Sequence, residues 1–193
     1  NDSVSTKMSQ MIEDQRNVHV LYSFHEEEDY MKQVLNYIHD GIVAGEYILL
    51  IENARLYPKI QKELKSKYTK TQFELVHYVN SLDFYFSSGS YHPPAIHEYF
   101  KKVVHPYVQN ETAFRSWAHV EWASMQEPLY LIEDFEKIVD EAVNELSFPL
   151  ICAYDGEKMP EYVKTFLMKT HPFVLVEDDI VVSENYQPSD KVI

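Results

Sequence analysis

The stretch Tyr47-Ile-Leu-Leu-Ile-Glu52 is apolar along nearly its whole length and is as long as one strand. A strand that exposes one face alternates apolar and polar residues, so a continuous apolar run is typical of a strand covered on both faces. Parallel sheets are covered in this way, because their crossover helices pack on both faces. The segment therefore predicts a strand inside a mostly parallel sheet.

Strand and helix patterns alternate on both sides of this segment. Apolar residues recur at helical spacing in residues 30–42 before it and in residues 57–64 after it. By the same reasoning, further strands are predicted at residues 18–24, 73–78, 114–122 and 148–154, and further helices at residues 96–107, at residues 129–146 and after Pro160. The alternation predicts an α/β fold with a mostly parallel central sheet, helices on both faces and right-handed crossovers.

Two stretches depart from this alternation. Short apolar runs at residues 173–176 and 180–182 predict a C-terminal β-hairpin. Residues 82–94 are the least regular part of the chain, because they combine serines, a glycine and two adjacent prolines. Long loops in compact domains often carry function. We therefore predict a long loop here that acts as a lid over a binding site.

Length and charge limit the classes of function. The chain has 193 residues, which suits one domain with a sizeable core, and a formal net charge of −14. Such a charge repels the phosphates of nucleic acids and of anionic membranes. No apolar run approaches the length that spans a bilayer, and the polar N-terminus lacks the apolar segment of a secretory signal. We expect a cytoplasmic protein that binds neither nucleic acid nor membranes directly.

The first strand–helix turn argues against nucleotide binding. A phosphate-binding domain has a glycine-rich loop at this place, whose backbone N–H groups cradle the anion. This chain has His25-Glu-Glu-Glu-Asp29 instead, with no glycine and with carboxylates that repel a triphosphate. Neither GxxxxGK[ST] nor GxGxxG occurs anywhere, and only four glycines are present. We predict that the fold lacks a functional P-loop.

No complete catalytic or metal-binding motif is present. The nucleophile elbow GxSxG and the zinc motif HExxH are both absent, although the chain contains nine histidines. The one cysteine, Cys152, lies mid-strand with no histidine near it in the sequence, so we expect a small core residue in a reducing compartment. His119-x-Glu121 could begin a metal site, but no tight ligand pattern completes it. We predict no catalytic residue, no metal and no cofactor.

Ligands of parallel α/β sheets bind at the carboxyl ends of the strands. Aromatic residues make up 14% of the chain, which suits either a bulky core or an aromatic pocket at those ends. The predicted ligand-binding residues are Ser23, Phe24, His25, Glu52, Tyr78, Arg115, Trp117, His119, Glu121, Trp122, Tyr154 and Asp155.

The segment from Arg115 to Glu121 is open to two interpretations. In a regular strand its odd-numbered residues, three of them polar or ionisable, lie on one face. Polar groups on a central strand are costly unless they are paired or lie in a cavity. One interpretation is a ligand site anchored by Glu121. The other is an internal ion pair of Arg115 or a satisfied polar network.

Four short segments carry a resemblance to a known family. They are His39-Asp-Gly-Ile-Val-Ala-Gly-Glu-Tyr47, Arg115-x5-Glu121-Trp122, Leu150-Ile-Cys-Ala-Tyr-Asp155, and His171-Pro172 followed by Asn185-Tyr186. In this order they resemble the MEDS domain, the sensory domain named for methanogens, methylotrophs and the dichloromethane repressor. The resemblance covers residues 17–187, which leaves residues 1–16 as an N-terminal extension and residues 188–193 as a tail.

The resemblance implies a three-layer sandwich similar to the RecA/KaiC core, with a degenerate phosphate loop. It also implies a domain that senses small molecules, including hydrocarbon derivatives, as in relatives attached to DNA-binding domains or histidine kinases. Glu121 and Trp122 loosely match the family's Glu-x-Trp-like strand end, here as adjacent residues, and Tyr154 and Asp155 match its motif after the fifth strand. Since the chain has no room for a DNA-binding or kinase module, we expect it either to act on a separate partner or to be a fragment of a larger protein.

We therefore predict the sensory domain of a bacterial or archaeal signalling system. A small, uncharged or weakly polar ligand binds among the aromatic residues, and a histidine kinase or transcription regulator receives the signal, with a homodimer as the default assembly. Two alternatives are a non-catalytic interaction module derived from a P-loop ATPase fold and a hydrolase that uses Glu121 and His119. The apolar cavity that would favour sensing is lined by Trp117, Trp122, Tyr78 and Tyr154.

Overall fold

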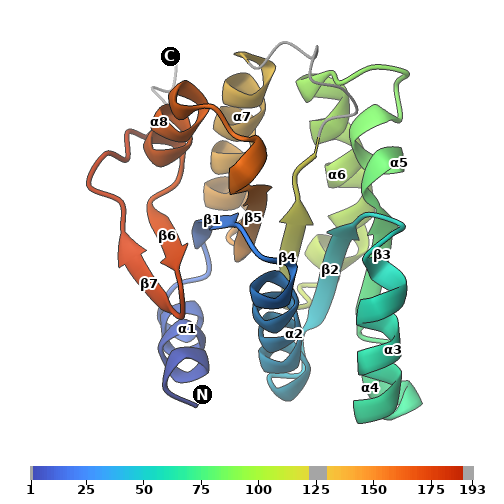
Figure 1. Ribbon diagram of the computed structural model, residues 1–193. Helices are drawn as coiled ribbons and strands as arrows, with labels where there is room; N and C mark the ends of the chain where they lie inside the picture. Colours follow the sequence, from blue (N-terminus) through green and yellow to red (C-terminus); the bar gives the residue numbers. More distant parts are fainter. Residues whose placement is uncertain (1, 122–129, 189–193) are drawn as a thin grey trace.

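The computed structural model describes residues 2–121 and 130–188, with side chains for residues 8–121 and 131–188. Within them, seven strands form one sheet in the order β3-β2-β4-β5-β1-β6-β7 (Figure 1). The strands are β1 (His19–Phe24), β2 (Tyr47–Glu52), β3 (Val76–Asn80), β4 (Phe114–His119), β5 (Leu150–Asp155), β6 (Phe173–Val176) and β7 (Asp179–Val182). All neighbours are parallel except β6 and β7, which form the expected antiparallel hairpin.

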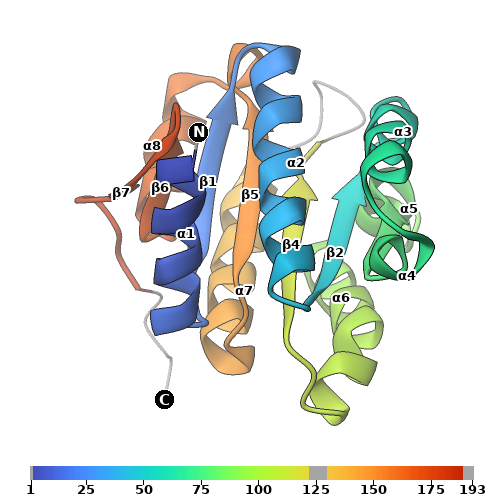
Figure 2. The same cartoon turned by 90° about the horizontal axis from the view of Figure 1, so that it is seen from below.

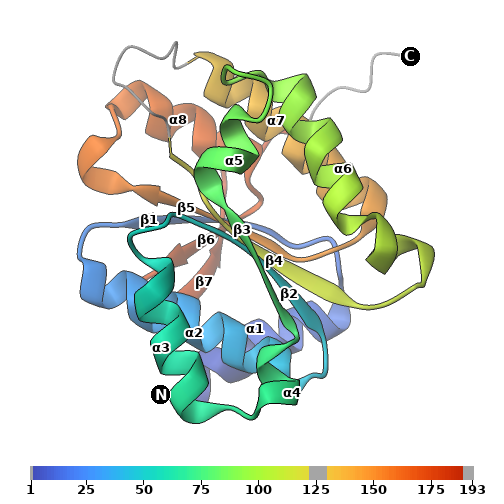
Figure 3. The same cartoon turned by 90° about the vertical axis from the view of Figure 1, so that its right-hand side faces the viewer.

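Helices cover both faces of the sheet, as Figure 3 shows. One layer consists of α1 (Asp2–Asp14), α2 (Glu27–Val43), α3 (Tyr57–Lys67) and α4 (Lys70–Phe73). The opposite layer consists of α5 (Ser81–Phe86), α6 (Pro93–Gln109), α7 (Tyr130–Leu146) and α8 (Glu161–Thr170). One turn of 3₁₀ helix, η1 (Gly156–Lys158), follows β5. The predicted α/β fold, with its mostly parallel sheet between two helical layers, is confirmed.

Each face of the sheet has its own hydrophobic core, because side chains alternate along a strand. In β2, Ile48 and Leu50 pack in the core under α1, α2 and α3, whereas Leu49 and Ile51 pack in the core under α5, α6 and α7. All four side chains are at most 1% exposed. This burial on both sides is the reason why residues 47–51 of this run are apolar.

Helix α2 lies over the middle of the sheet (Figure 2). It approaches the sheet closely at Gly41. A Cβ atom at Gly41 would lie 2.8 Å from Cγ1 of Ile48 and 2.9 Å from Cδ of Arg115, which is closer than carbon atoms pack. The chain then turns from α2 into β2 through Gly45, whose φ of 72° costs glycine nothing. The two glycines therefore set the position of α2 over β2 and β4.

The structure differs from the sequence predictions in three places. The third strand begins at Val76, because a capping box between Thr69 and Gln72 starts the short helix α4 before it. The prediction of a long loop at residues 82–94 is wrong for its first part, which forms helix α5. Asn80 caps this helix, and its aromatic side chains pack in the core. The fourth strand ends at His119, earlier than predicted, and residue 122 lies outside the described residues.

Residues 1–16, expected as an extension, contain helix α1. Met8 and Ile12 are buried in the same core as Val18, and the helix packs against α2 and β7. Among the described residues, none of the helices combines the length and the apolar composition needed to cross a bilayer.

Candidate functional site

A cavity of about 260 Å³ opens at the carboxyl ends of β1 and β4, where the first strand–helix turn faces the connection after β2. We call it the strand-end cavity. Among the predicted ligand-binding residues, those that line it are Phe24, His25, His119, Glu121 and Asp155. The other lining residues are Glu27, Tyr30, Asn53, Arg55, Leu56, Val120 and Lys158. The prediction of a site at the strand ends thus corresponds to a cavity of the size that a small organic molecule occupies.

A chain of hydrogen bonds lies directly beneath this cavity. Nε1 of Trp117 donates to the hydroxyl of Tyr30 at 2.9 Å, and that hydroxyl donates to the carboxylate of Glu52. Oε1 of Glu52 lies 2.6 Å from Nδ1 of His119 and accepts the backbone N–H of Asn53 at 2.9 Å. Glu52 is fully buried, so these bonds replace the water that its carboxylate loses. The network holds His119 in one orientation at the cavity floor.

The network keeps Tyr30 protonated. Burial raises the pKa of Tyr30 well above its ordinary value, and the adjacent Glu52 carboxylate raises it further. The phenol therefore stays protonated at neutral pH and donates to Glu52.

Glu121 occupies the edge of the cavity. Its Oε1 accepts Nδ2 of Asn53 at 2.8 Å and lies 3.7 Å from Nδ1 of His119. The side chain of Glu121 is 40% exposed, so the carboxylate is held in place by Asn53 and still open to a ligand. An anchored, accessible carboxylate can accept hydrogen bonds from a hydroxyl or an amine.

An aromatic wall completes the cavity. The ring of Phe24 packs 4.6 Å from that of Tyr30 and 5.3 Å from that of His119, between ring centroids. Leu56, which is buried, lies on the same lining surface. The cavity therefore offers an apolar wall beside a carboxylate and an imidazole.

Some charged groups at the rim of the cavity are paired. Glu27 accepts Nη1 of Arg55 at 2.7 Å and Nζ of Lys59 at 2.8 Å, and these two cations lower its pKa to about 2. Nδ1 of His25 lies 2.9 Å from Oε1 of Glu157. The pairing of Glu27 reduces the negative charge that the first loop presents to the cavity, but that loop still contains no glycine to cradle a phosphate.

Arg115 lies away from the cavity, near the start of β4. Its Nη2 and Nε atoms lie 2.5 and 3.1 Å from Oε2 of Glu46, and its guanidinium stands 5.0 Å from the ring centre of Tyr37. Arg16 also bonds Glu46. Both members of the Arg115–Glu46 pair are almost fully buried. The structure thus places Arg115 in the internal ion pair that was one of the two interpretations of its segment.

Three aromatic residues predicted at the site lie elsewhere. Trp117 is fully buried behind Tyr30, and the ring of Tyr78 stacks 3.6 Å from that of Tyr57. Tyr154 is buried on the other face of the sheet, where its hydroxyl donates to Oε1 of Glu136 at 2.8 Å. Among the described residues, these rings therefore do not form one apolar cavity.

The other predicted residues are placed as follows. Ser23 packs beside Gly156 and lines a neighbouring cavity of about 390 Å³ with Asp29 and Asp178. Asp155 caps η1 by accepting the backbone N–H of Glu157 at 3.0 Å. The predicted contribution of Trp122 lies outside the described residues.

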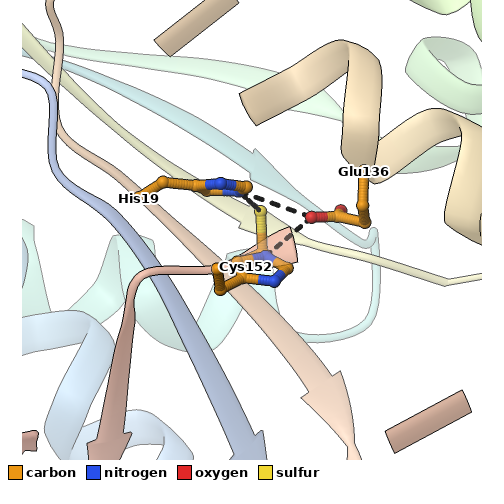
Figure 4. Close-up of side chains that lie close together, drawn as sticks. His19, Glu136 and Cys152 are labelled. Carbon is orange, nitrogen blue, oxygen red and sulfur yellow. Dashed lines mark hydrogen bonds and ion pairs between the residues drawn. The ribbon is translucent and has the colours of Figure 1, made fainter. Parts of the chain in front are cut away.

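A second group of polar side chains lies inside the opposite core, and the sequence reasoning missed it. The donor atoms of His19 in β1, Glu136 in α7, Cys152 in β5 and His171 after α8 all lie within 4.8 Å of one another, and we call these residues the buried cluster. Figure 4 shows the side chains of His19, Glu136 and Cys152 pointing toward one another. Their residue exposures are all 1% or less. No local spacing reveals them, because they are distant in sequence. One signal was available: Glu136 interrupts the apolar stripe of residues 129–146.

Charges in the buried cluster are coupled. Burial alone would raise the pKa of Glu136, but His171 and His19 beside it hold that pKa below its ordinary value. Burial would likewise lower the pKa of His19, yet Asp140 and Glu136 raise it to about 9. Burial and the neighbouring His19 lower the pKa of His171. Glu136 is therefore a buried carboxylate that depends on its two histidines.

Comparison with known proteins identifies the family. Residues 18–172 match the family model described as MEDS, the MEthanogen/methylotroph, DcmR Sensory domain. No curated protein matches the chain. The matched range includes β1 to β5, the strand-end cavity and all members of the buried cluster. The chain belongs to the MEDS family of sensory domains.

Proposed function

We propose that this chain is the ligand-binding sensory domain of a prokaryotic signal-transduction or transcription-regulation system, with its ligand in the strand-end cavity. The observation that supports this most directly is the position of Glu121, a carboxylate held by Asn53 at the edge of a cavity with an aromatic wall. A few converging polar groups in a partly apolar concavity are typical of small-molecule sites.

The lining favours a small molecule with a polar head and a short apolar part. Glu121 and His119 can bind a hydroxyl or amine group of the ligand, and Phe24 and Leu56 can cover its carbon atoms. A triphosphate fits poorly, because the first loop offers carboxylates in place of glycine N–H groups. Short alcohols and amines are therefore the ligand class that we propose.

Signalling requires a ligand that binds two states of the protein with different affinity. The cavity is bordered by Glu27, in the first turn of α2, and by Arg55 and Leu56, just before α3. A ligand held between these segments can change how α2 and α3 present their surfaces. The net charge of −14 favours a basic surface on the partner protein, such as a histidine kinase or transcription regulator in the cytoplasm.

A thermal-shift screen of the purified chain tests this proposal. A ligand at 100 times its Kd stabilises the native state by about 2.7 kcal/mol, which corresponds to a rise in Tm of roughly 5–10 °C for a chain of this length. We expect a short alcohol or amine to raise Tm, and Glu121→Gln to weaken that ligand at least about tenfold. Glu63→Gln is the matched control, since Glu63 is exposed on α3 and outside the cavity.

The screen also includes halogenated hydrocarbons and ATP with magnesium. A rise in Tm with ATP would overturn the argument from the glycine-free loop. If no small molecule raises Tm, the sensory proposal is wrong for this cavity, and the chain is better described as a protein-interaction module.

A further inference from the structure

The buried cluster brings four metal-binding side chains to one point in the core opposite the strand-end cavity. One donor atom from each of His19, Glu136, Cys152 and His171 lies within 4.8 Å of all the others. Figure 4 shows the three labelled side chains converging from β1, α7 and β5. Two imidazoles, a thiol and a carboxylate are the ligand types found in zinc sites.

The distances suit a tetrahedral cation. Bonds of 2.0–2.3 Å around tetrahedral zinc separate neighbouring donor atoms by roughly 3.3–3.7 Å. Nε2 of His19 lies 3.4 Å from Oε2 of Glu136 and 3.4 Å from Sγ of Cys152. Nε2 of His171 and Oε2 of Glu136 are closer, at 2.6 Å, and a cation between them would separate them. Two of the three measured separations therefore match tetrahedral edges.

Two of these donor atoms are buried and have only each other and the rest of the cluster as neighbours of opposite polarity. Oε2 of Glu136 and Nε2 of His171 lie 2.6 Å apart as an ion pair, and among the described residues neither atom has a further hydrogen-bonding partner. Both atoms lie within 4.8 Å of the donor atoms of His19 and Cys152, so one metal ion could bind all of them together.

Outer contacts orient the ligands in the way that metal sites require. Nδ1 of His19 lies 3.0 Å from Oδ1 of Asp140, and Nδ1 of His171 lies 2.8 Å from the backbone carbonyl of Leu167. When each Nδ1 donates to its oxygen, each Nε2 is free to bind a metal. The hydroxyl of Tyr154 binds Oε1 of Glu136, which leaves Oε2 for the centre. Each histidine thus has the carboxylate or carbonyl partner that is usual behind metal-bound imidazole.

We propose that the buried cluster binds one Zn²⁺ ion through His19, Glu136, Cys152 and His171. The Glu136 carboxylate and the Cys152 thiolate together balance the two positive charges, so the ion and its four ligands are neutral. Thiolate and imidazole select zinc over Mg²⁺ and Ca²⁺, which prefer oxygen. All four positions are taken by protein, so the ion is structural and ties β1, β5 and α7 to the segment after α8.

Cobalt substitution tests the site. The full chain, without a histidine tag, is refolded from urea with one equivalent of Co²⁺ and a phosphine reductant. We expect one bound Co²⁺ per chain, the visible bands of tetrahedral cobalt and a sulfur-to-cobalt charge-transfer band, all removed by one equivalent of Zn²⁺. Because Cys152 is the one cysteine of the chain, that band in the unmodified protein reports on it directly.

Two variants locate the ligands, and one serves as control. Cys152→Ala should abolish the charge-transfer band, and Glu136→Gln, which keeps an oxygen for Tyr154, should weaken Co²⁺ at least about tenfold in competition with a chelator. His77→Ala should change neither, since His77 is exposed on β3. A folded, unmodified chain that retains no Co²⁺, or that retains it without the sulfur band, overturns the proposal. Retained Co²⁺ that is lost in Glu121→Gln would assign the metal to His119 and Glu121 instead.

Discussion

At the scale of single residues, polar side chains inside this protein are arranged in separate networks. Arg115 and Glu46 form a buried ion pair, Glu52 is surrounded by donors, and Glu136 lies between two histidines. A buried charge that loses its partner is strongly destabilising. Removing one partner from any of these networks should therefore lower the free energy of unfolding more than breaking an exposed ion pair does.

The Arg115–Glu46 pair gives the clearest case. Arg115→Met should lower the free energy of unfolding by about 3 kcal/mol, because it leaves Glu46 buried with only Arg16 as a partner. The double variant Arg115→Met/Glu46→Leu should recover part of this loss, since no charge then stays buried at the pair. Urea unfolding of the single and double variants measures both values. A double variant less stable than Arg115→Met would contradict this account.

At the scale of secondary-structure elements, helix positions are set by close contacts that sequence periodicity does not contain. Gly41 lets α2 approach Ile48 and Arg115 more closely than any larger residue would. In the same way, Asn80 starts α5 by accepting the backbone N–H groups of Leu82 and Asp83. These contacts explain why a stretch that looks irregular in sequence forms a helix that packs in the core.

Gly41→Val should therefore destabilise the protein by about 3 kcal/mol, because the new side chain has no space between α2 and the sheet. The matched control is Asn36→Val, which puts the same side chain on the exposed face of α2. The control should change stability by less than about 0.5 kcal/mol. Thermal or urea unfolding compares the two, and equal effects would show that helix propensity rather than contact with the sheet is responsible.

At the scale of the whole molecule, α1 belongs to the packed structure. Ile12 is 2% exposed and shares a core with α2, and α1 also contacts β7. If residues 1–16 were a separable extension, substitutions there would leave the stability of the domain unchanged.

We expect Ile12→Ala to lower the free energy of unfolding by about 2–4 kcal/mol, similar to Leu64→Ala in α3, which fills the same core. Glu13→Ala, on the exposed side of α1, should have little effect. Urea unfolding decides between the two views of this segment. A loss below about 0.5 kcal/mol for Ile12→Ala would support the extension.

The sequence by itself determined the fold class, the hairpin and the edge of the sheet where a cavity occurs. It could do so because strand and helix periodicity is local, and because the carboxyl ends of parallel strands always meet at one edge. Alternation also predicted that Trp117 and His119 share one face of β4, and in the structure both contact Tyr30. These inferences require only residues that are close in the chain.

Only the tertiary structure decided which polar groups meet. Whether Arg115 reaches a ligand or pairs with Glu46 depends on how α2 and β2 pack against β4, and no local pattern records this. The buried cluster joins two strands, a helix and a connecting segment, so its members become neighbours only when the sheet order is set. Sheet order results from the packing of distant segments. For this reason no residue spacing in the sequence predicts the cluster.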